Sequence, residues 1–194
     1  MTISSVHAPS EAAAHDAEDR AAMWVFIIGD LFVFLGWFTF YFYYRASEES
    51  LFLAAQTHLD LTLGLINTLI LLVSSWAVAL GLHAARSGRY ARARGFTWLP
   101  MLCAAAFGVS KIVEWQAEIA AGHSFTADDF FMFYYFLTGI HLFHVMMGMS
   151  VLGVMLRELR APAPSDTVIS NCAVFWHLVD LLWVVIFALV YLLR

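Results

Sequence analysis

Charged residues are scarce in this chain: only 13% of its 194 residues are Asp, Glu, Lys or Arg, about half of the roughly 25% found in soluble domains. Hydrophobic residues make up 62%, and the mean hydropathy is +0.76. A soluble domain of this size could not bury so much apolar surface, so an ordinary cytosolic domain is excluded. Disorder is excluded too, because it needs low hydrophobicity and high charge. The composition therefore indicates a membrane protein.

Several kinds of functional motif are missing as well. The chain has no P-loop, no G-x-S-x-G, no H-E-x-x-H and no dinucleotide-binding fingerprint. Its net charge is −5, and no basic stripe is present that could bind nucleic acid. The two cysteines, Cys103 and Cys172, lie apart in apolar sequence and are typical of small buried hydrophobic residues. We therefore expect no disulfide and no cysteine-based metal site.

Five apolar runs follow a polar, acidic beginning of the chain. They cover residues 23–44, 59–84, 98–121, 130–156 and 172–193. Each is long enough for a spanning helix of about 20 residues, and none alternates like a barrel strand. We expect an all-α, polytopic membrane bundle of five transmembrane helices. Residues 21–194 would form this single domain, after a mobile polar N-terminal tail, residues 1–20, that is not a cleaved signal peptide.

Basic residues are concentrated on one side of this five-span topology. Seven lie on the side of the N-terminus: Arg20, Arg86, Arg89, Arg92, Arg94, Arg157 and Arg160. The other side has only Arg45 and Arg194. The positive-inside rule then predicts a cytoplasmic N-terminus and an external C-terminus. Aromatic residues near the ends of the runs, among them residues 40–44, Trp98 and Tyr191, are typical of interface belts.

Polar and ionisable side chains inside the runs are the candidate functional residues, because they are costly in a bilayer. This predicted membrane polar network comprises Asp30, Asn67, Lys111, Glu114, Glu118, His141, His144, His177 and Asp180. On one helix, Lys111 and Glu114 are three residues apart and can pair, and Glu118 follows one turn later. Two close carboxylates in a low dielectric cannot easily both ionise. Either Lys111 neutralises one, or one holds a proton, or the group serves as a link between helices.

The histidines allow two readings. His141 and His144, three residues apart, could join His177 and Asp180 in a metal or haem site. The paired Glu-x-x-His pattern of di-metal bundles is absent, however, because Ala117 stands three residues after Glu114. We therefore expect structural histidines that donate hydrogen bonds to Asp180 or Glu114 across the bundle.

Four segments, in this order, resemble subunit III of the haem-copper oxidases. They are NT at 67–68 with SS at 74–75, KIVEW at 111–115, TGIHLFHV at 138–145 and WHLVDLLW at 176–183. The resemblance extends over residues 23–194 and suggests a short, five-helix form of a family whose mitochondrial members have seven helices. The run WVFIIGDLFVF at 24–34, together with Lys111 and the compact length, is most similar to the paralogue associated with nitric oxide reductase.

This resemblance implies a non-catalytic accessory subunit without a redox cofactor. Such subunits support the assembly, stability and proton uptake of a catalytic, subunit I-like haem-copper partner in the electron transport chain. Asp30, Glu114, His141, His144, His177 and Asp180 match the family's polar positions in the membrane. Contact with lipids is implied as well, but not the lipid cleft of the seven-helix form, because its first two helices are missing here. The alternative is an independent membrane carrier, or a metal- or haem-binding membrane enzyme, that uses the polar core itself.

The predicted orientation can be tested with a cysteine at position 87, in the Arg-rich connection between the second and third runs. We expect Ser87→Cys to react with an impermeant thiol reagent only after the membrane has been opened, because positive-inside places this connection in the cytoplasm. Labelling of Ser87→Cys in intact cells would contradict the orientation.

Overall fold

The computed structural model describes residues 11–193, and all of its regular structure in this range is helical. The elements are α1 (Glu11–Ser47), α2 (Glu49–Gln56), α3 (Leu61–Arg86), α4 (Tyr90–Ala120), α5 (Asp129–Glu158), α6 (Asp166–Phe187) and the π-helical turn η1 (Ala188–Leu192). Five helices are long and apolar enough to cross a membrane. The prediction of an all-α bundle with five spans is therefore confirmed.

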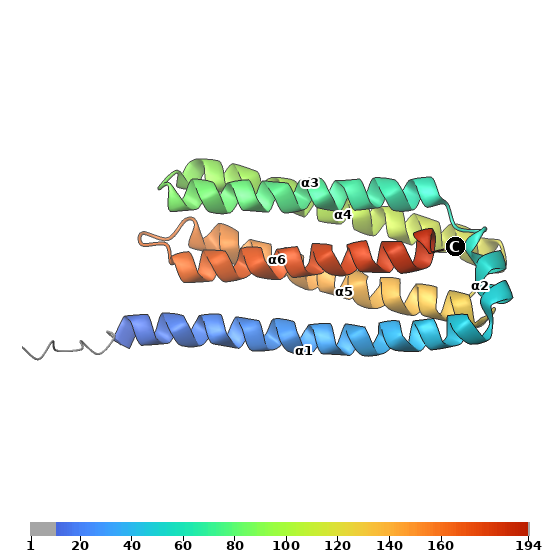
Figure 1. The fold of residues 1–194 in the computed structure, drawn as a ribbon. Coiled ribbons are helices and arrows are strands. Elements are labelled where there is room, and N and C mark those ends of the chain that lie inside the picture. Colours follow the sequence, from blue (N-terminus) through green and yellow to red (C-terminus); the bar gives the residue numbers. More distant parts are fainter. Residues whose placement is uncertain (1–10, 194) are drawn as a thin grey trace, which may run out of the picture.

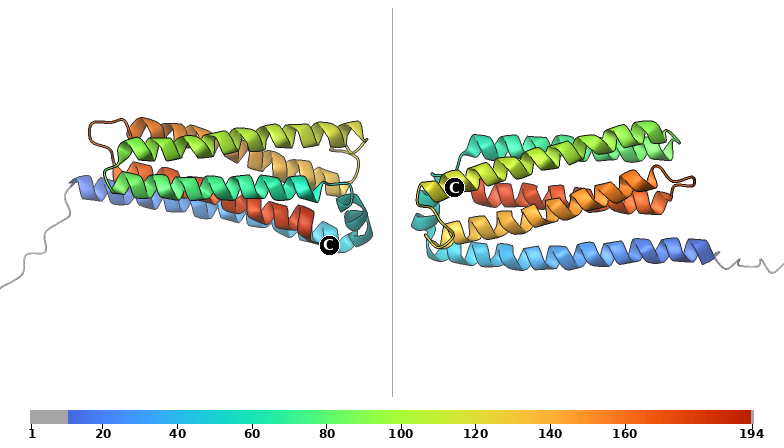
Figure 2. Two further views of the ribbon diagram at one scale, coloured as in Figure 1. Left: turned by 90° about the horizontal axis from the view of Figure 1, so that it is seen from above. Right: turned by 180° about the vertical axis from the view of Figure 1, so that it is seen from behind.

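The five long helices run alternately up and down, and α2 is a short connection across one end (Figure 1). The central helix is α6, which contacts α1, α3 and α5. In its most apolar window 67% of the residues are buried, against 11% in α1. Helix α1 lies on the opposite side of the bundle from α3 and α4 (Figures 1 and 2). The start of α1 and the α3–α4 and α5–α6 connections share one end of the molecule, which carries the Arg-rich segments.

The beginning of the chain differs from expectation. Helix α1 starts at Glu11, so residues 11–20 of the predicted mobile tail are helical. Ala-rich sequence favours helix, and the apolar run that begins at residue 23 continues it. Residues 1–10 lie outside the described part of the chain, and the mobility predicted for them stays a prediction.

Local signals in the sequence account for the helix ends. Asp60 caps α3 by accepting hydrogen bonds from the backbone N–H groups of Thr62 and Leu63, and Asp128 caps α5 through Phe131 N–H. Helix α3 ends at Arg86 and is followed by Gly88, whose φ of 71° is left-handed and favours glycine. Gly122, with a φ of 94°, plays the same part after α4. These caps make the sharp turns that fold the long helices back on one another.

Helix packing is closest where a glycine faces an aromatic ring. A Cβ atom at Gly148 would lie 2.7 Å from the Trp176 ring, and one at Gly64 would lie 2.9 Å from the Tyr191 ring. At Gly153, by contrast, a Cβ atom would meet nothing within 4 Å. The glycines at 64 and 148 therefore allow α6 and η1 to approach their neighbours, as small residues commonly do in membrane bundles.

We expect Gly148→Ala to destabilise the bundle by about 1–3 kcal/mol, the usual cost of overpacking. Trp176 cannot move aside easily, because it is fully buried and its indole N–H is bonded to Ser74 Oγ at 2.8 Å. Thermal unfolding in detergent, followed by tryptophan fluorescence, measures the change. Gly153→Ala is the matched control and should leave the transition almost unchanged. Equal losses in both variants would contradict the close contact at Gly148.

Candidate functional site: a buried charged cluster

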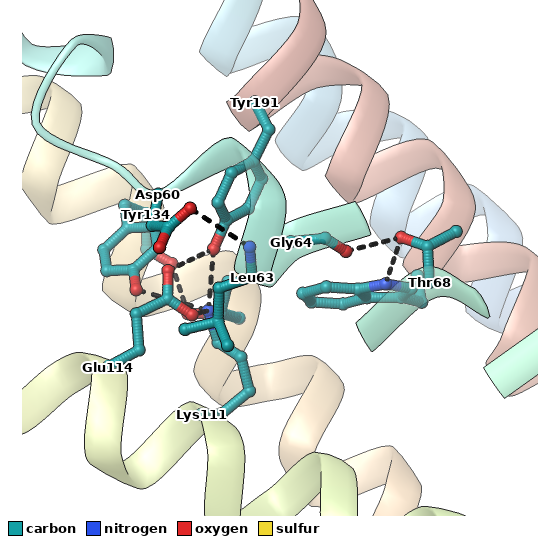
Figure 3. A network of polar contacts seen from close by, with 10 residues as sticks. Asp60, Leu63, Gly64, Thr68, Lys111, Glu114, Tyr134 and Tyr191 are labelled. Carbon is teal, nitrogen blue, oxygen red and sulfur yellow. Dashed lines mark hydrogen bonds and ion pairs between the residues drawn. The ribbon is translucent and has the colours of Figure 1, made fainter. Parts of the chain in front are cut away.

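Four buried polar side chains form one hydrogen-bonded group, which we call the Lys111 cluster (Figure 3). The Lys111 ammonium of α4 donates to Glu114 Oε2 at 2.8 Å, to the Tyr191 hydroxyl at 2.9 Å and to the Tyr134 hydroxyl at 3.2 Å. The Tyr191 hydroxyl donates to Glu114 Oε1 at 2.5 Å. All three N–H donors of Lys111 therefore have an acceptor, and both oxygens of Glu114 have a donor. The arrangement is that of a complete ion pair.

The Lys111 cluster is shielded from the surroundings. Lys111 and Tyr134 are 0% exposed, Tyr191 is 3% exposed and Glu114 is 4% exposed. The Lys111 ammonium also lies 4.8 Å from the centre of the Tyr134 ring and 5.5 Å from the Trp183 ring, distances at which cation–π attraction operates. A charge without partners at this depth would be strongly destabilising. Partners from α4, α5 and η1 remove that penalty and join these three elements.

Tyr191 reaches the cluster through a local change of helix type. After Phe187 the chain continues as the π-turn η1, closed by the bond from Leu193 N–H to Ala188 O at 2.9 Å. Such a turn accommodates an extra residue and so changes which side chains face inward. The sequence led us to place Tyr191 in an interface belt. That was wrong, because η1 turns its ring into the bundle.

The π-turn is held in place by residues of α1 and α2. The Tyr41 hydroxyl donates to Leu189 O at 2.8 Å, and Gln56 Nε2 donates to Val190 O at 3.0 Å. Arg45 Nη1 donates to Gln56 Oε1 at 3.2 Å and so orients the amide. Tyr41 is fully buried, so its assignment to an interface belt was wrong too. These bonds link the position of Tyr191 to the packing of the first two helices.

A second polar contact joins α1 to α5. His144 Nε2 lies 3.1 Å from Asp30 Oδ1, and His144 Nδ1 lies 2.9 Å from Ile140 O. Because the carbonyl oxygen can only accept, Nδ1 carries a proton. Ile27, Phe34 and Tyr41, at seven-residue spacing, are buried along helix α1.

Side-chain hydrogen bonds join the middle of α3, over residues 68–75, to residues 176–183 of α6. They are Trp183 Nε1 to Thr68 Oγ1 at 3.0 Å, Trp176 Nε1 to Ser74 Oγ at 2.8 Å, and the contact between Ser75 Oγ and His177 Nδ1 at 2.7 Å. These residues come from the NT, SS and WHLVDLLW segments. Two of the four segments that carry the family resemblance, NT with SS and WHLVDLLW, therefore meet at the α3–α6 interface.

Three residues of the predicted network have no hydrogen-bond partner within the described part of the chain. They are Asn67, His141 and Asp180, whose side-chain polar atoms are all buried. The His141 ring lies between the rings of Phe107 and Trp183, with centroid separations of 5.4 Å and 5.2 Å. The expected bond from a histidine to Asp180 or Glu114 was therefore wrong. Spacing along a helix tells which residues share a face, but not which helix that face meets.

Glu118 lies apart from the Lys111 cluster. Its Oε2 is 2.8 Å from Nδ1 of His123, in the connection after α4, and the His123 ring stacks on Phe131. Glu118 thus helps to order the α4–α5 connection at one end of the bundle, in place of sharing a proton with Glu114.

Sequence reasoning missed the tyrosines of the Lys111 cluster. Tyr134 and Tyr191 were part of aromatic-rich runs in which nothing distinguished them from lipid-facing rings. One signal was available: a buried ammonium needs three acceptors, and Glu114 supplies only one of them. That requirement points to hydroxyl groups on neighbouring helices, but it does not say which helix supplies them.

The Lys111 cluster can hold helices together and stabilise buried charge. Its ionisable groups, Lys111 and Glu114, bond to each other and to the two tyrosines. Among residues 11–193, no group of three His, Cys, Asp or Glu side chains is placed to hold a metal ion.

Comparison with known proteins places this architecture among respiratory subunits. The family model described as cytochrome c oxidase subunit III matches residues 12–194. Cytochrome c oxidase subunit 3 of Thermostichus vulcanus is 30% identical over 173 residues, which is 87% of this chain and 84% of that protein. Cytochrome bo(3) ubiquinol oxidase subunit 3 of Pseudomonas aeruginosa is 27% identical over 188 residues, covering 93% of this chain and 88% of that protein.

A third relative has a different organisation. Heme-copper oxidase subunit I+III of Aeropyrum pernix is 28% identical over 184 residues. The match covers 89% of this chain but only 22% of that longer protein.

We predict that Lys111→Met leaves Glu114 without its cation and so forces the carboxyl group to take up a proton. Glu114 should then react with an apolar carbodiimide, at least severalfold more than in the parent, where it is an ion-paired carboxylate. The same change should cost about 3–5 kcal/mol of stability, as expected when one partner of a buried pair is removed. Peptide mapping measures the labelling, and thermal unfolding in detergent measures the stability.

The double variant Lys111→Met/Glu114→Gln is the matched control for this prediction. It should recover most of the lost stability, because no unpaired charge remains. Two results would contradict the ion pair. One is a Glu114 that stays unreactive in both the parent and Lys111→Met. The other is modification of Glu114 by water-soluble reagents as readily as the exposed Glu48.

Proposed function

The chain belongs to the cytochrome c oxidase subunit III family, and from this membership we propose that it is a non-catalytic accessory subunit of a respiratory haem-copper complex. It is a multi-pass membrane protein. The match to subunit 3 relatives along nearly their whole length favours this function over an independent carrier or a metal- or haem-binding enzyme.

The main support for the proposal is that the buried polar groups bond to other groups of the same chain. Lys111 donates all three of its hydrogen bonds within the chain, and both oxygens of Glu114 are occupied. Asp30 and His144 serve as the contact between α1 and α5. Groups that are committed to holding helices together are poor candidates for catalysis. The chain's contribution is then made through its surfaces, on a neighbouring subunit.

A subunit I-like catalytic protein is the partner we propose. The Aeropyrum relative is named subunit I+III and is much longer than this chain, which supports a close association of the two kinds of subunit. In this proposal the five-helix bundle supports assembly, stability and proton uptake of the partner.

Two finer parts of the proposal go beyond family membership. We propose that the Arg-rich end, which includes the α3–α4 and α5–α6 connections, faces the cytoplasm. The resemblance to the paralogue associated with nitric oxide reductase is kept as a proposal for the subfamily, alongside the oxygen-reducing oxidases to which the named relatives belong.

Affinity purification from native membranes tests the proposed function. A tagged chain, solubilised in a mild detergent, should co-purify with a larger haem-bearing subunit, and the complex should show a Soret band. The complex should consume either oxygen or nitric oxide with a suitable electron donor, and that outcome identifies the acceptor.

Lys111→Met should weaken retention of the partner or shorten the lifetime of turnover without loss of haem, because it disturbs the bundle and not a redox centre. The exposed-site variant Glu48→Gln should behave like the parent.

The proposal is wrong if the tagged chain purifies alone and carries its own cofactor. The decisive observation would be a Soret band, or one equivalent of a transition metal, in the isolated chain that disappears in His144→Ala.

A further inference from the structure

A groove on the outer face of the α3–α4 hairpin has features that the proposed function does not use. It encloses about 620 Å³. Its body is apolar and includes Leu80 of α3 and Phe96 and Leu99 of α4. One end is basic and includes Arg89 and Arg92 of α4. At 1.5 Å per helical residue, Leu99 lies about 10 Å deeper along α4 than Arg92, so the groove runs from the helix ends toward the middle of the bundle.

The two arginines at the basic end are unpaired, unlike others nearby. Arg86 is bonded to Asp166 at 3.1 Å, and Arg94 donates to Leu159 O at 3.4 Å. The side chains of Arg89 and Arg92 are exposed, and neither has a hydrogen bond or ion pair to another residue in the described range. Since guanidinium groups bind phosphate strongly and with defined geometry, the pair can hold one anionic group.

We propose that this groove binds an anionic phospholipid, with its phosphate between Arg89 and Arg92 and an acyl chain along Leu80, Phe96 and Leu99. Basic pockets between membrane helices at the cytoplasmic surface are suited to such head groups. The apolar body distinguishes a lipid from a free anion, because a soluble phosphate gains nothing from contact with Phe96 or Leu99. The positions of the basic and apolar ends also match the direction in which a lipid lies in its leaflet.

Gly95 leaves the room that the acyl chain would occupy. It lines the groove, and a Cβ atom placed there would meet nothing within 4 Å. Gly95→Leu should therefore fill the apolar body without straining the helix pair. Gly153 of α5 has equally open surroundings but lies outside the groove, so Gly153→Leu is its matched control.

Native mass spectrometry of the full-length protein provides the test. The affinity-purified complex, and the chain released from it, are equilibrated with vesicles of phosphatidylcholine that contain phosphatidylglycerol as the minor lipid. We expect the parent to retain one phosphatidylglycerol in both forms. Arg89→Gln/Arg92→Gln should reduce this retention about tenfold or more, since each basic residue near an anionic lipid contributes appreciably. Arg157→Gln/Arg160→Gln removes the same charge at the same end of the bundle, outside the groove, and should retain the lipid.

The remaining variants and competition experiments distinguish a bound lipid from other ligands of the groove. Gly95→Leu should lose the lipid and Gly153→Leu should keep it. Displacement of the lipid by inorganic phosphate at similar concentration, with no effect of Gly95→Leu, would show a free-anion site and overturn the proposal. Equal loss in the two arginine variants would show unspecific charge attraction and overturn it too. The proposal would also be overturned if the released chain retained phosphatidylglycerol and the complex did not, because the groove would then be covered by protein in the complex. Should Arg89→Gln/Arg92→Gln fail to fold, the pair of glycine variants decides.

Discussion

The cost of a charged ammonium group in a low-dielectric interior is the constraint on which the rest of this bundle depends. Lys111 is fully buried, so it needs three acceptors and a compensating negative charge. Glu114, one turn along the same helix, supplies the charge. The remaining acceptors, Tyr134 and Tyr191, come from α5 and η1. Satisfying one side chain therefore requires three separate parts of the chain to meet at one depth.

This requirement extends to the ends of the chain. Tyr191 faces Lys111 because the last turn is π-helical, and Tyr41 and Gln56 donate hydrogen bonds to carbonyl groups of that turn. Helix α1, which buries little of its own surface, and helix α2 are thus coupled to the central cluster. A second link, between Asp30 and His144, fixes α1 along its length. The bundle is held by a few buried polar contacts as well as by apolar packing, as is common where lipid offers no hydrophobic drive between helices.

Under the proposed function, these contacts also explain how an accessory subunit can matter to a respiratory complex. A bundle whose helices are joined by such contacts can present defined surfaces to a neighbouring subunit and to lipids. Helix α1 and the α3–α4 hairpin, which forms the groove, lie on opposite sides of the bundle (Figure 1). The structure therefore offers two separate surfaces for two different kinds of contact.

The sequence by itself determined the number of spans, the all-helical class and the family, because hydrophobic length and ordered motifs are local properties of the chain. It also placed Lys111 beside Glu114, since residues three apart share a helix face. Only the tertiary structure decided the partners supplied by other helices. The pairing of His144 with Asp30, the inward turn of Tyr191 and the isolation of His141 and Asp180 from hydrogen-bond partners in the described chain depend on how each helix is rotated against its neighbours. That rotation results from close contacts such as Gly148 with Trp176, which lie on different helices and leave no trace in the local pattern.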